Sequence, residues 1–340
     1  MPVERARSAV QERNARSRGF AWVPVKDVVH NPASPSLPSD ARQALAVSAP
    51  RMLPAPIRWW QEVSELIKFR LTLLVLLTTL IGYCLGSGHP IDGLRALHAV
   101  VGTALVAAAA AVLNEVIERR QDAQMARTRN RPIAAGRVDG LHAAGAAVAS
   151  AAAGVAYLAL FTNFLAALVA AATLATYVCV YTPLKLLSPW NTWVGAISGG
   201  LPPVIGYVSA KNAVDETALF LLALLFLWQM PHFFAIAWLY RNDYERAGFR
   251  MLVVVDATGR KLTSQTVFFT SVLLLVSLWP MAAGTTSLPY SLGATVLGSL
   301  FLWTAIRFHN GPDRATARAL FFASIAYLPL LLGLLVLFWK

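Results

Sequence analysis

The chain has 340 residues, of which 57% are hydrophobic and only 14% are charged. A composition this apolar excludes an ordinary soluble protein and predicts a polytopic membrane protein. The net charge of +12 does not indicate nucleic-acid binding, because the Lys and Arg residues lie mostly in the N-terminal tail and in short loops between apolar segments, where they set membrane topology.

Residues 1–55 are rich in Arg, Ala, Ser and Pro and contain no apolar run. This composition predicts a disordered tail that faces the cytoplasm. The basic start resembles a mitochondrial transit peptide, but acidic residues such as Glu4 and Glu12 argue against one. We therefore expect a bacterial extension followed by one membrane domain over residues 56–340, with the mitochondrial inner membrane as the less favoured location.

Nine apolar segments follow the tail, each close to the ~20 residues that span a bilayer as a helix. They are Phe69–Leu85, Leu97–Val116, Ala143–Leu160, Phe164–Tyr181, Thr192–Val208, Ala218–Tyr240, Val267–Ala283, Leu288–Ile306 and Leu320–Phe338. Only a short polar break at Thr162 and Asn163 separates the third segment from the fourth, so a single long helix is the competing prediction there. The expected fold is all-α, a polytopic membrane protein with nine transmembrane helices.

Positive charge is divided unequally between the connecting loops. Fifteen Lys and Arg residues lie in the loops after the second, fourth, sixth and eighth segments, against three on the opposite side. The positive-inside rule therefore places the N-terminus and these four loops in the cytoplasm. The long loops after the second and sixth segments hold most of the side chains capable of chemistry, which predicts a site opening on the cytoplasmic face of the bacterial inner membrane.

The end of the second apolar segment reads NEVIERRQDAQMARTRNRP. Asn114, Glu118 and Asp122 recur every fourth residue and therefore share one face of a helix. Acids at the C-terminal end of a helix are unfavourable beside its dipole unless a cation binds them. Mg²⁺ takes such oxygen ligands and often shares them with phosphates. Because Arg127 and Arg131 follow, and Arg side chains grip diphosphate oxygens, the pattern predicts a Mg²⁺–diphosphate site.

A simpler interpretation of this stretch stays open. The acids can belong to a solvated helix end and pair locally with Arg119 and Arg120. Three polar residues in register, next to a transmembrane segment and an Arg cluster, favour the functional interpretation.

The loop after the sixth segment, YRNDYERAGFRML, is a second acidic–basic cluster. Asp243 and Glu245 supply carboxylates, while Arg241, Arg246 and Arg250 supply cations. Two such clusters on one membrane face could hold a metal-bridged diphosphate from both sides. The alternative is an ordinary charged loop at the interface.

Between the clusters, Tyr181 and Lys185 lie four residues apart and could reach one phosphate together. The alternative is an interfacial Tyr and a Lys whose ammonium extends to the membrane surface. The fifth segment is rich in small and helix-breaking residues, namely Gly195, Gly199, Gly200, Pro202 and Pro203. These residues favour either tight helix packing or space for a bulky ligand, and both interpretations stay open.

Three motifs together resemble the protohaem IX farnesyltransferases (haem O synthases) of the UbiA-type intramembrane prenyltransferase superfamily. They are N-x3-E-x3-D followed by MxRTxNRP, YTPLK…SPWNTWVGAISGGLPPVIG, and WQMPHF…DYERAGFRML. The resemblance covers roughly residues 60–340. It implies nine helices around a central cavity, with Mg²⁺ and farnesyl diphosphate at the cytoplasmic end. It also implies that haem B, a substrate rather than a cofactor, receives the farnesyl group on a vinyl carbon, and that haem O is handed to haem A synthase or to terminal-oxidase assembly.

The resemblance also implies roles for particular side chains. Asn114, Glu118 and Asp122 fall on the first metal–diphosphate motif and Asp243 falls on the second, as catalytic and metal-binding residues. The residues that fall where phosphate-gripping side chains are expected are Arg127, Arg131, Tyr181 and Lys185. In three places the chain departs from the pattern: Glu118 replaces the more usual Asp, Ala247 stands where a further Asp is usual, and Phe69 replaces the Pro of Lys-Pro-Arg. Metal binding by the second motif, and a part for Glu245 in it, therefore stay open.

His232 is the one histidine well inside a predicted transmembrane segment. Polar residues at this depth are costly and often functional. The functional interpretation is a haem-iron ligand or a hydrogen-bond donor in the cavity, and the alternative is a histidine bonded to a neighbouring helix.

Two other classes of function compete with haem farnesylation. A related prenyltransferase acting on a quinone or chlorophyll precursor would share the fold and the metal site. An ion-coupled transporter would instead place acids at mid-membrane in related halves of the chain. The acids cluster at one membrane face here, which favours an enzyme over a transporter.

Overall fold

Helices account for nearly all regular structure in residues 55–88 and 90–340, the part of the chain that the computed structural model describes. Within this part, one isolated bridge joins Thr286 to Trp339. Residues 55–340 form one compact unit, and the predicted domain boundaries stay a prediction. The predicted tail lies outside the described residues up to residue 54.

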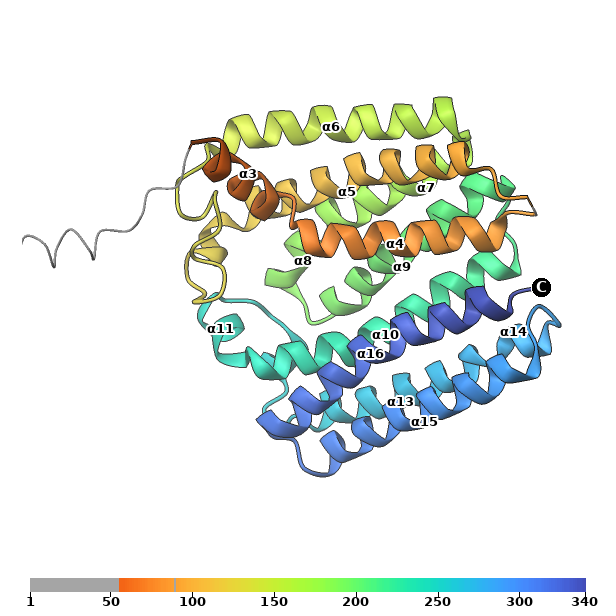
Figure 1. The fold of residues 1–340 in the computed structure, drawn as a ribbon. Helices are drawn as coiled ribbons and strands as arrows, with labels where there is room; N and C mark the ends of the chain where they lie inside the picture. Colours follow the sequence, from red (N-terminus) through yellow and green to blue (C-terminus); the bar gives the residue numbers. More distant parts are fainter. Residues whose placement is uncertain (1–54, 89) are drawn as a thin grey trace, which may run out of the picture. The chain divides into compact units, whose positions relative to one another are not determined.

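Each predicted apolar segment lies largely within helical structure (Figure 1). The long elements are α4 (Phe69–Gly86), α5 (Gly93–Asp122), α6 (Gly140–Phe161), α7 (Phe164–Ala175) continued by η2 (Thr176–Tyr181) and α8 (Thr182–Leu187), α9 (Asn191–Lys211), α10 (Glu216–Leu239), α13 (Arg260–Ser277) followed by α14 (Trp279–Ala282), α15 (Leu288–Asn310) and α16 (Arg314–Phe338). Three short helices complete the set: α3 (Ala55–Leu66), α11 (Arg241–Arg246) and α12 (Leu252–Val255). The all-α prediction is confirmed.

Eight helical segments in the described residues are long and apolar enough to cross a membrane, and α9 is not among them. Gly, Pro, Ser, Thr and Asn residues lower the hydropathy of α9, and 14 of its 21 residues are buried. A helix enclosed by other helices needs fewer apolar side chains than a helix that faces lipid. The count of nine transmembrane helices therefore stays a prediction at α9.

The break between α6 and α7 rules out the single long helix that was the competing prediction there. Helix α6 ends at Phe161, and Asn163 caps α7 by accepting a hydrogen bond from the Ala166 amide at 2.8 Å. Its side-chain amide donates to the Val208 carbonyl on α9 at 2.8 Å. One asparagine therefore starts α7 and fixes it to α9.

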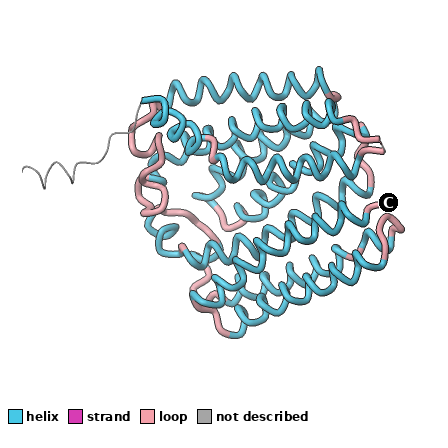
Figure 2. The backbone as a smooth tube through the Cα atoms, in the orientation of Figure 1, coloured by secondary structure: helices cyan, strands magenta, loops and turns pink. Residues whose placement is uncertain are grey.

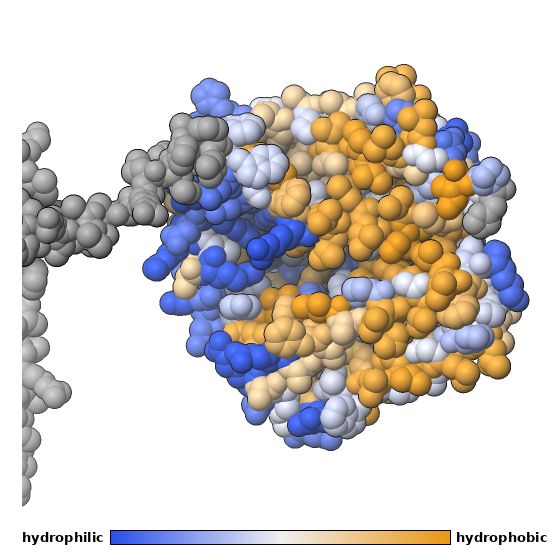
Figure 3. All heavy atoms as spheres, viewed as in Figure 1, coloured by the Kyte–Doolittle hydropathy of each residue, from blue (hydrophilic) through white to orange (hydrophobic). Residues whose placement is uncertain are grey.

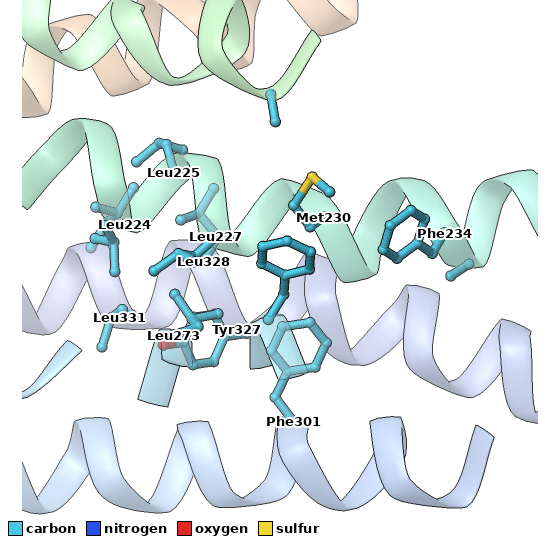
Figure 4. Packing of buried hydrophobic residues seen from close by; sticks show 14 of the residues in the cluster. Leu224, Leu225, Leu227, Met230, Phe234, Leu273, Phe301, Tyr327, Leu328 and Leu331 are labelled. Atoms are coloured by element: carbon cyan, nitrogen blue, oxygen red, sulfur yellow. The ribbon is translucent and has the colours of Figure 1, made fainter. Parts of the chain in front are cut away.

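The helices form two packing groups with different cores. Large side chains fill the space between α10, α13, α15 and α16, as Figure 4 shows for residues such as Leu224, Phe301 and Tyr327. Small residues such as Ala109 and Ala147 let α5 and α6 pack closely in the other group. Helices α9 and α10 pack against each other and join the two groups.

Helices α4 and α9 touch backbone to backbone. A Cβ atom added to Gly82 would lie 1.9 Å from the Pro203 carbonyl oxygen, and one added to Gly206 would lie 1.8 Å from the Thr79 carbonyl oxygen. Only glycine permits such an approach. Gly199 similarly makes room for the Gln229 side chain, whose Oε1 would lie 2.0 Å from an added Cβ. Small residues of the fifth segment therefore serve packing.

The connections collect at the two ends of the helices (Figure 2). Hydrophilic residues gather at the end that carries α11 and the α5–α6 loop, whereas the visible sides of the bundle are mainly apolar (Figure 3). The two long loops predicted to share one membrane face therefore lie at one end of the bundle, and the apolar sides suit contact with lipid.

Candidate active site

The acidic residues near the C-terminal end of α5 point into the protein. Asn114, Glu115, Glu118 and Asp122 are all buried, and the side chains of Glu115 and Asp122 are fully inaccessible. The predicted common face of three residues thus exists, and it includes a fourth, Glu115.

Local pairing of the acids with Arg119 and Arg120, the simpler interpretation of the stretch, is wrong. Both arginines are exposed, because residues next to each other in a helix project about 100° apart. The acids instead pair with cations from other elements.

Glu118 pairs with Lys185, whose Nζ lies 2.7 Å from Oε1. The ammonium of Lys185 also lies 4.5 Å from the centre of the Tyr181 ring, so the predicted Tyr181–Lys185 pair is in contact. The Tyr181 ring has room because a Cβ atom at Gly195 would lie 2.6 Å from it. Glycine on α9 therefore helps to place the cation that neutralises Glu118.

The π-helical turn η2 precedes Lys185 and widens the helix by one residue. Thr182 donates a hydrogen bond to the Tyr177 carbonyl at 2.9 Å and accepts one from the Asn114 amide at 3.2 Å. Turns of this kind occur often at functional sites. Here η2 leads into α8, where Thr182 and Lys185 contact the polar face of α5.

Asp122 pairs with Arg131 from the loop that follows α5. Its Oδ2 lies 2.7 Å from Nη1, and the Nε atom of the same arginine lies 3.6 Å from Glu115 Oε1. Thr128 donates to the Asp122 carbonyl at 3.0 Å, which folds the loop back over the end of the helix. One predicted phosphate-binding residue therefore neutralises two acids in this state.

Lys68, just before α4, supplies a third cation to the same face. Its Nζ donates to Asn114 Oδ1 at 2.7 Å. Desolvation of the ammonium, and then the charges of Arg131 and Lys185, lower the pKa of Lys68 to about 7. Lys68 was not among the predicted site residues, and its segment departed from the family pattern only in having Phe69 where a proline is usual.

Glu115 was also missed in the sequence analysis, although the spacing contained the signal. It precedes Glu118 by three residues and Asp122 by seven, which again places them on one helix face. In the described structure, both of its carboxylate oxygens and Asp122 Oδ1 are buried without a hydrogen-bond donor. Buried carboxylate oxygens without donors are costly, and a bound cation would remove that cost.

The donor set suits Mg²⁺, which prefers oxygen and usually takes only one or two carboxylates besides substrate phosphates. No group of three or more His, Cys, Asp or Glu side chains in residues 55–88 and 90–340 is arranged to hold a metal ion. The acids of α5 are spread over two helical turns, and protein cations contact them. The site can therefore accept a metal only together with other ligands, such as phosphate oxygens.

The second cluster lies beside the first, but its carboxylate Asp243 is paired within its own helix. Arg127 stacks on the Tyr240 ring at 5.0 Å, and its Nη2 lies 3.4 Å from the Tyr244 hydroxyl. The Arg250 amide donates to the Lys185 carbonyl at 2.7 Å. Asp243, however, pairs with Arg246 within α11.

The remaining charged residues of the second cluster are more accessible to solvent. Glu245 and Arg250 are exposed, whereas Ala247, which stands where a further Asp is usual, is buried. The loops that carry Asp122 and Asp243 thus share one face of the bundle, while the metal-binding and phosphate-binding roles of the individual residues stay predictions.

His232 forms the interhelical hydrogen bond that the sequence analysis weighed as an alternative. Its Nδ1 lies 2.8 Å from Ser324 Oγ on α16, and that hydroxyl donates its only proton to the Phe321 carbonyl at 2.6 Å. The hydroxyl must therefore accept from Nδ1, so Nδ1 carries the proton. Trp228 and Phe321 stack on the imidazole with ring centres 5.0 and 5.2 Å away. Its Nε2 is left as an acceptor or a ligand for iron.

Residues 75–328 match the UbiA prenyltransferase family. The chain is 42% identical to a protoheme IX farnesyltransferase of Solibacter usitatus over 286 residues, which are 82% of this chain and 98% of that protein. It is 36% identical to the human mitochondrial protoheme IX farnesyltransferase, over 81% of this chain and 61% of that protein.

Two solved structures share the fold at low sequence identity. A digeranylgeranylglyceryl phosphate synthase superposes with a TM-score of 0.70 at 17% identity, over 82% of this chain and 97% of that chain. A UbiA homologue from Archaeoglobus fulgidus bound to GPP and Mg²⁺ superposes with a TM-score of 0.57 at 14% identity, over 80% and 99% of the two chains.

Proposed function

Because the chain belongs to the UbiA prenyltransferase family, we propose that it is a membrane-embedded transferase that converts haem B to haem O. The farnesyl group of farnesyl diphosphate is the group transferred, and a vinyl group of haem B accepts it. The observation that carries this proposal is the 42% identity to a protoheme IX farnesyltransferase across 98% of that protein. The buried acids of α5, each paired with a Lys or Arg side chain, would supply the matching diphosphate site.

The metal is proposed to lie on the polar face of α5. Mg²⁺ would bind among the Asn114 side-chain oxygen and the carboxylates of Glu115, Glu118 and Asp122, with only one or two carboxylates as direct ligands, and Asp243 would approach from α11 after leaving Arg246. When bound, the ion supplies positive charge to the leaving diphosphate. The Archaeoglobus homologue was solved with both GPP and Mg²⁺, which supports a shared metal and diphosphate site in this fold.

The cations of the site then have a second task. Lys185 and Arg131, which now neutralise Glu118 and Asp122, would be released to the diphosphate oxygens as the acids turn to the metal. Tyr181 contacts Lys185, and Arg127 lies on the Tyr240 ring at the same end of the bundle; both would bind the same diphosphate. Positive groups held in place before the bond breaks stabilise the departing charge, usually the largest catalytic effect.

The chemistry of the transfer balances without an oxidant. The allylic C–O bond of farnesyl diphosphate breaks, and the electron pair leaves with the diphosphate. The vinyl group forms a bond to the farnesyl carbon. Water then adds to the resulting cation and loses a proton, which leaves a hydroxyethylfarnesyl side chain. Trp228 and Phe321 flank His232, whose free Nε2 is the proposed contact to haem iron.

The decisive assay measures haem O formed from haem B, farnesyl diphosphate and Mg²⁺ by the purified chain, with pyrophosphate release followed in parallel. We expect release that depends on both Mg²⁺ and haem B. Release with an aromatic quinone precursor but none with haem B would favour the alternative acceptor. Absence of metal-dependent release with any acceptor would overturn the assignment as a prenyltransferase.

We further propose the bacterial inner membrane as the location, with the N-terminus and the site loops cytoplasmic. The excess of Lys and Arg in the even-numbered loops supports this orientation. The relatives include bacterial and mitochondrial proteins, and eight helical segments of the described residues are long and apolar enough to cross a membrane. Transfer of haem O to haem A synthase or to terminal-oxidase assembly stays a prediction.

A further inference from the structure

The outer side of the helical end that carries the site is hollowed. A groove of about 500 Å³ runs between the C-terminal end of α5 and the N-terminal end of α6. Its apolar lining comes from Val116, Ile117, Leu141 and Ala144, and Arg119 and Arg120 stand at its polar rim. We call this feature the α5–α6 groove.

No side chain in residues 55–88 and 90–340 neutralises the charge at the rim. Arg119 and Arg120 are exposed and make no ion pair with the described residues. The acids of the same helix pair with Arg131 and Lys185 instead. At the start of α6, the Asp139 carboxylate already accepts from the His142 amide at 2.9 Å.

The position of the groove fits a molecule with a charged head and an apolar tail. Val116 lies about one helical turn before Arg119 and Arg120, and therefore deeper in the membrane-spanning part of α5. Basic pockets between transmembrane helices at the cytoplasmic surface suit anionic lipid head groups. A single guanidinium group can bind two phosphate oxygens through two parallel N–H groups, so each arginine suits a lipid phosphate.

We propose that the α5–α6 groove binds one anionic phospholipid. The lipid phosphate lies on Arg119 and Arg120, and one acyl chain lies along the apolar lining. This site is separate from the proposed diphosphate site, because none of the α5 acids lines the groove and those acids are buried, whereas Arg119 and Arg120 are exposed. The inference therefore does not depend on the proposed reaction.

Native mass spectrometry of the full chain, released from detergent and titrated with phosphatidylglycerol or phosphatidylcholine, tests the proposal. We expect one phosphatidylglycerol to bind the wild-type chain at least tenfold more tightly than phosphatidylcholine. The variant R119Q/R120Q should lose that preference. The matched control R314Q/R318Q removes the same charge from two exposed positions at the start of α16 and should keep it.

Two further arms keep the test decisive. Ala144→Phe fills the apolar lining without changing charge and should weaken phosphatidylglycerol binding about as much as R119Q/R120Q. Glycerol 3-phosphate, which has the head-group charge but no acyl chain, should not displace the lipid. Equal losses in the two arginine double variants, full binding by Ala144→Phe, or displacement by glycerol 3-phosphate would each overturn the proposal.

Discussion

The clusters after α5 and after α10 resemble each other in sequence, but the protein buries only one of them. Asp122 has a side chain with 0% exposure and pairs with Arg131 across a loop. Asp243 is 14% exposed and pairs with Arg246, itself 60% exposed, three residues along one short helix. Exposed pairs of the second kind contribute on the order of 0–1 kcal/mol to stability.

This difference shows what makes an acidic cluster a candidate metal site. In the first cluster, carboxylate oxygens are buried and some have no hydrogen-bond donor, so a bound cation would stabilise them. In the second cluster, solvent and a neighbouring guanidinium already stabilise the carboxylate. Burial with incomplete pairing, rather than acid content, therefore distinguishes the two.

The largest expected effect comes from Asp122→Asn. The substitution keeps the shape of the side chain but removes a proposed metal ligand, and we expect haem O formation to fall by about 10²–10³-fold, a loss typical of one electrostatic catalytic group. Turnover with haem B, farnesyl diphosphate and Mg²⁺ measures it. Near-normal turnover would show that Asp122 is not a metal ligand, and burial would then no longer distinguish the functional cluster from the other one.

The second effect concerns the ion pair between Lys185 and Glu118. Lys185→Met should lower turnover about 10²-fold through loss of charge at the diphosphate. It should also destabilise the protein by roughly 3–5 kcal/mol, because a buried acid loses its partner.

The double variant K185M/E118Q separates these two losses. It removes the unpaired charge, so thermal stability should recover while activity stays low. Recovery of activity in the double variant would show that Lys185 serves only to neutralise Glu118.

A smaller effect is expected from Asp243→Asn. Because this carboxylate is locally paired in α11, we expect turnover to fall only about tenfold, within the range seen for supporting residues of metal sites. Titration of activity with Mg²⁺ shows whether the affinity for the ion changes. A loss of turnover as large as that of Asp122→Asn would show that both clusters contribute equally to catalysis, which contradicts the proposed difference between them.

The smallest effect should come from Ser324→Ala, outside both clusters. The substitution removes the acceptor for His232 Nδ1–H and should lower stability by about 1 kcal/mol. If Nε2 binds iron, His232→Ala should shift the absorption band of bound haem B strongly, and Ser324→Ala should shift it slightly. An unchanged band in both variants would contradict iron binding by His232.

Much of the fold was predictable, because the signals are local. Apolar length predicted the helices, and the Thr162–Asn163 break was visible in the sequence because an asparagine can cap a helix. Spacing predicted the acid face of α5, and the Lys and Arg asymmetry predicted that the two loops share one side.

The partners of the acids were not predictable, because they depend on tertiary contacts. Arg131 folds back from a loop, and Lys185 arrives through a π-helical turn that no spacing rule signals. The Ser324 partner of His232 depends on how α10 packs on α16. The low hydropathy of α9 does not reveal that this helix is enclosed by neighbouring helices.

The glycine contacts between α4 and α9 limit how this membrane domain can move. Where main chain rests on main chain, sliding or rotation of one helix against the other would bring backbone atoms into collision, so we expect α4 and α9 to move together. If a planar macrocycle as wide as a porphyrin enters between helices, we therefore expect helices other than this pair to separate.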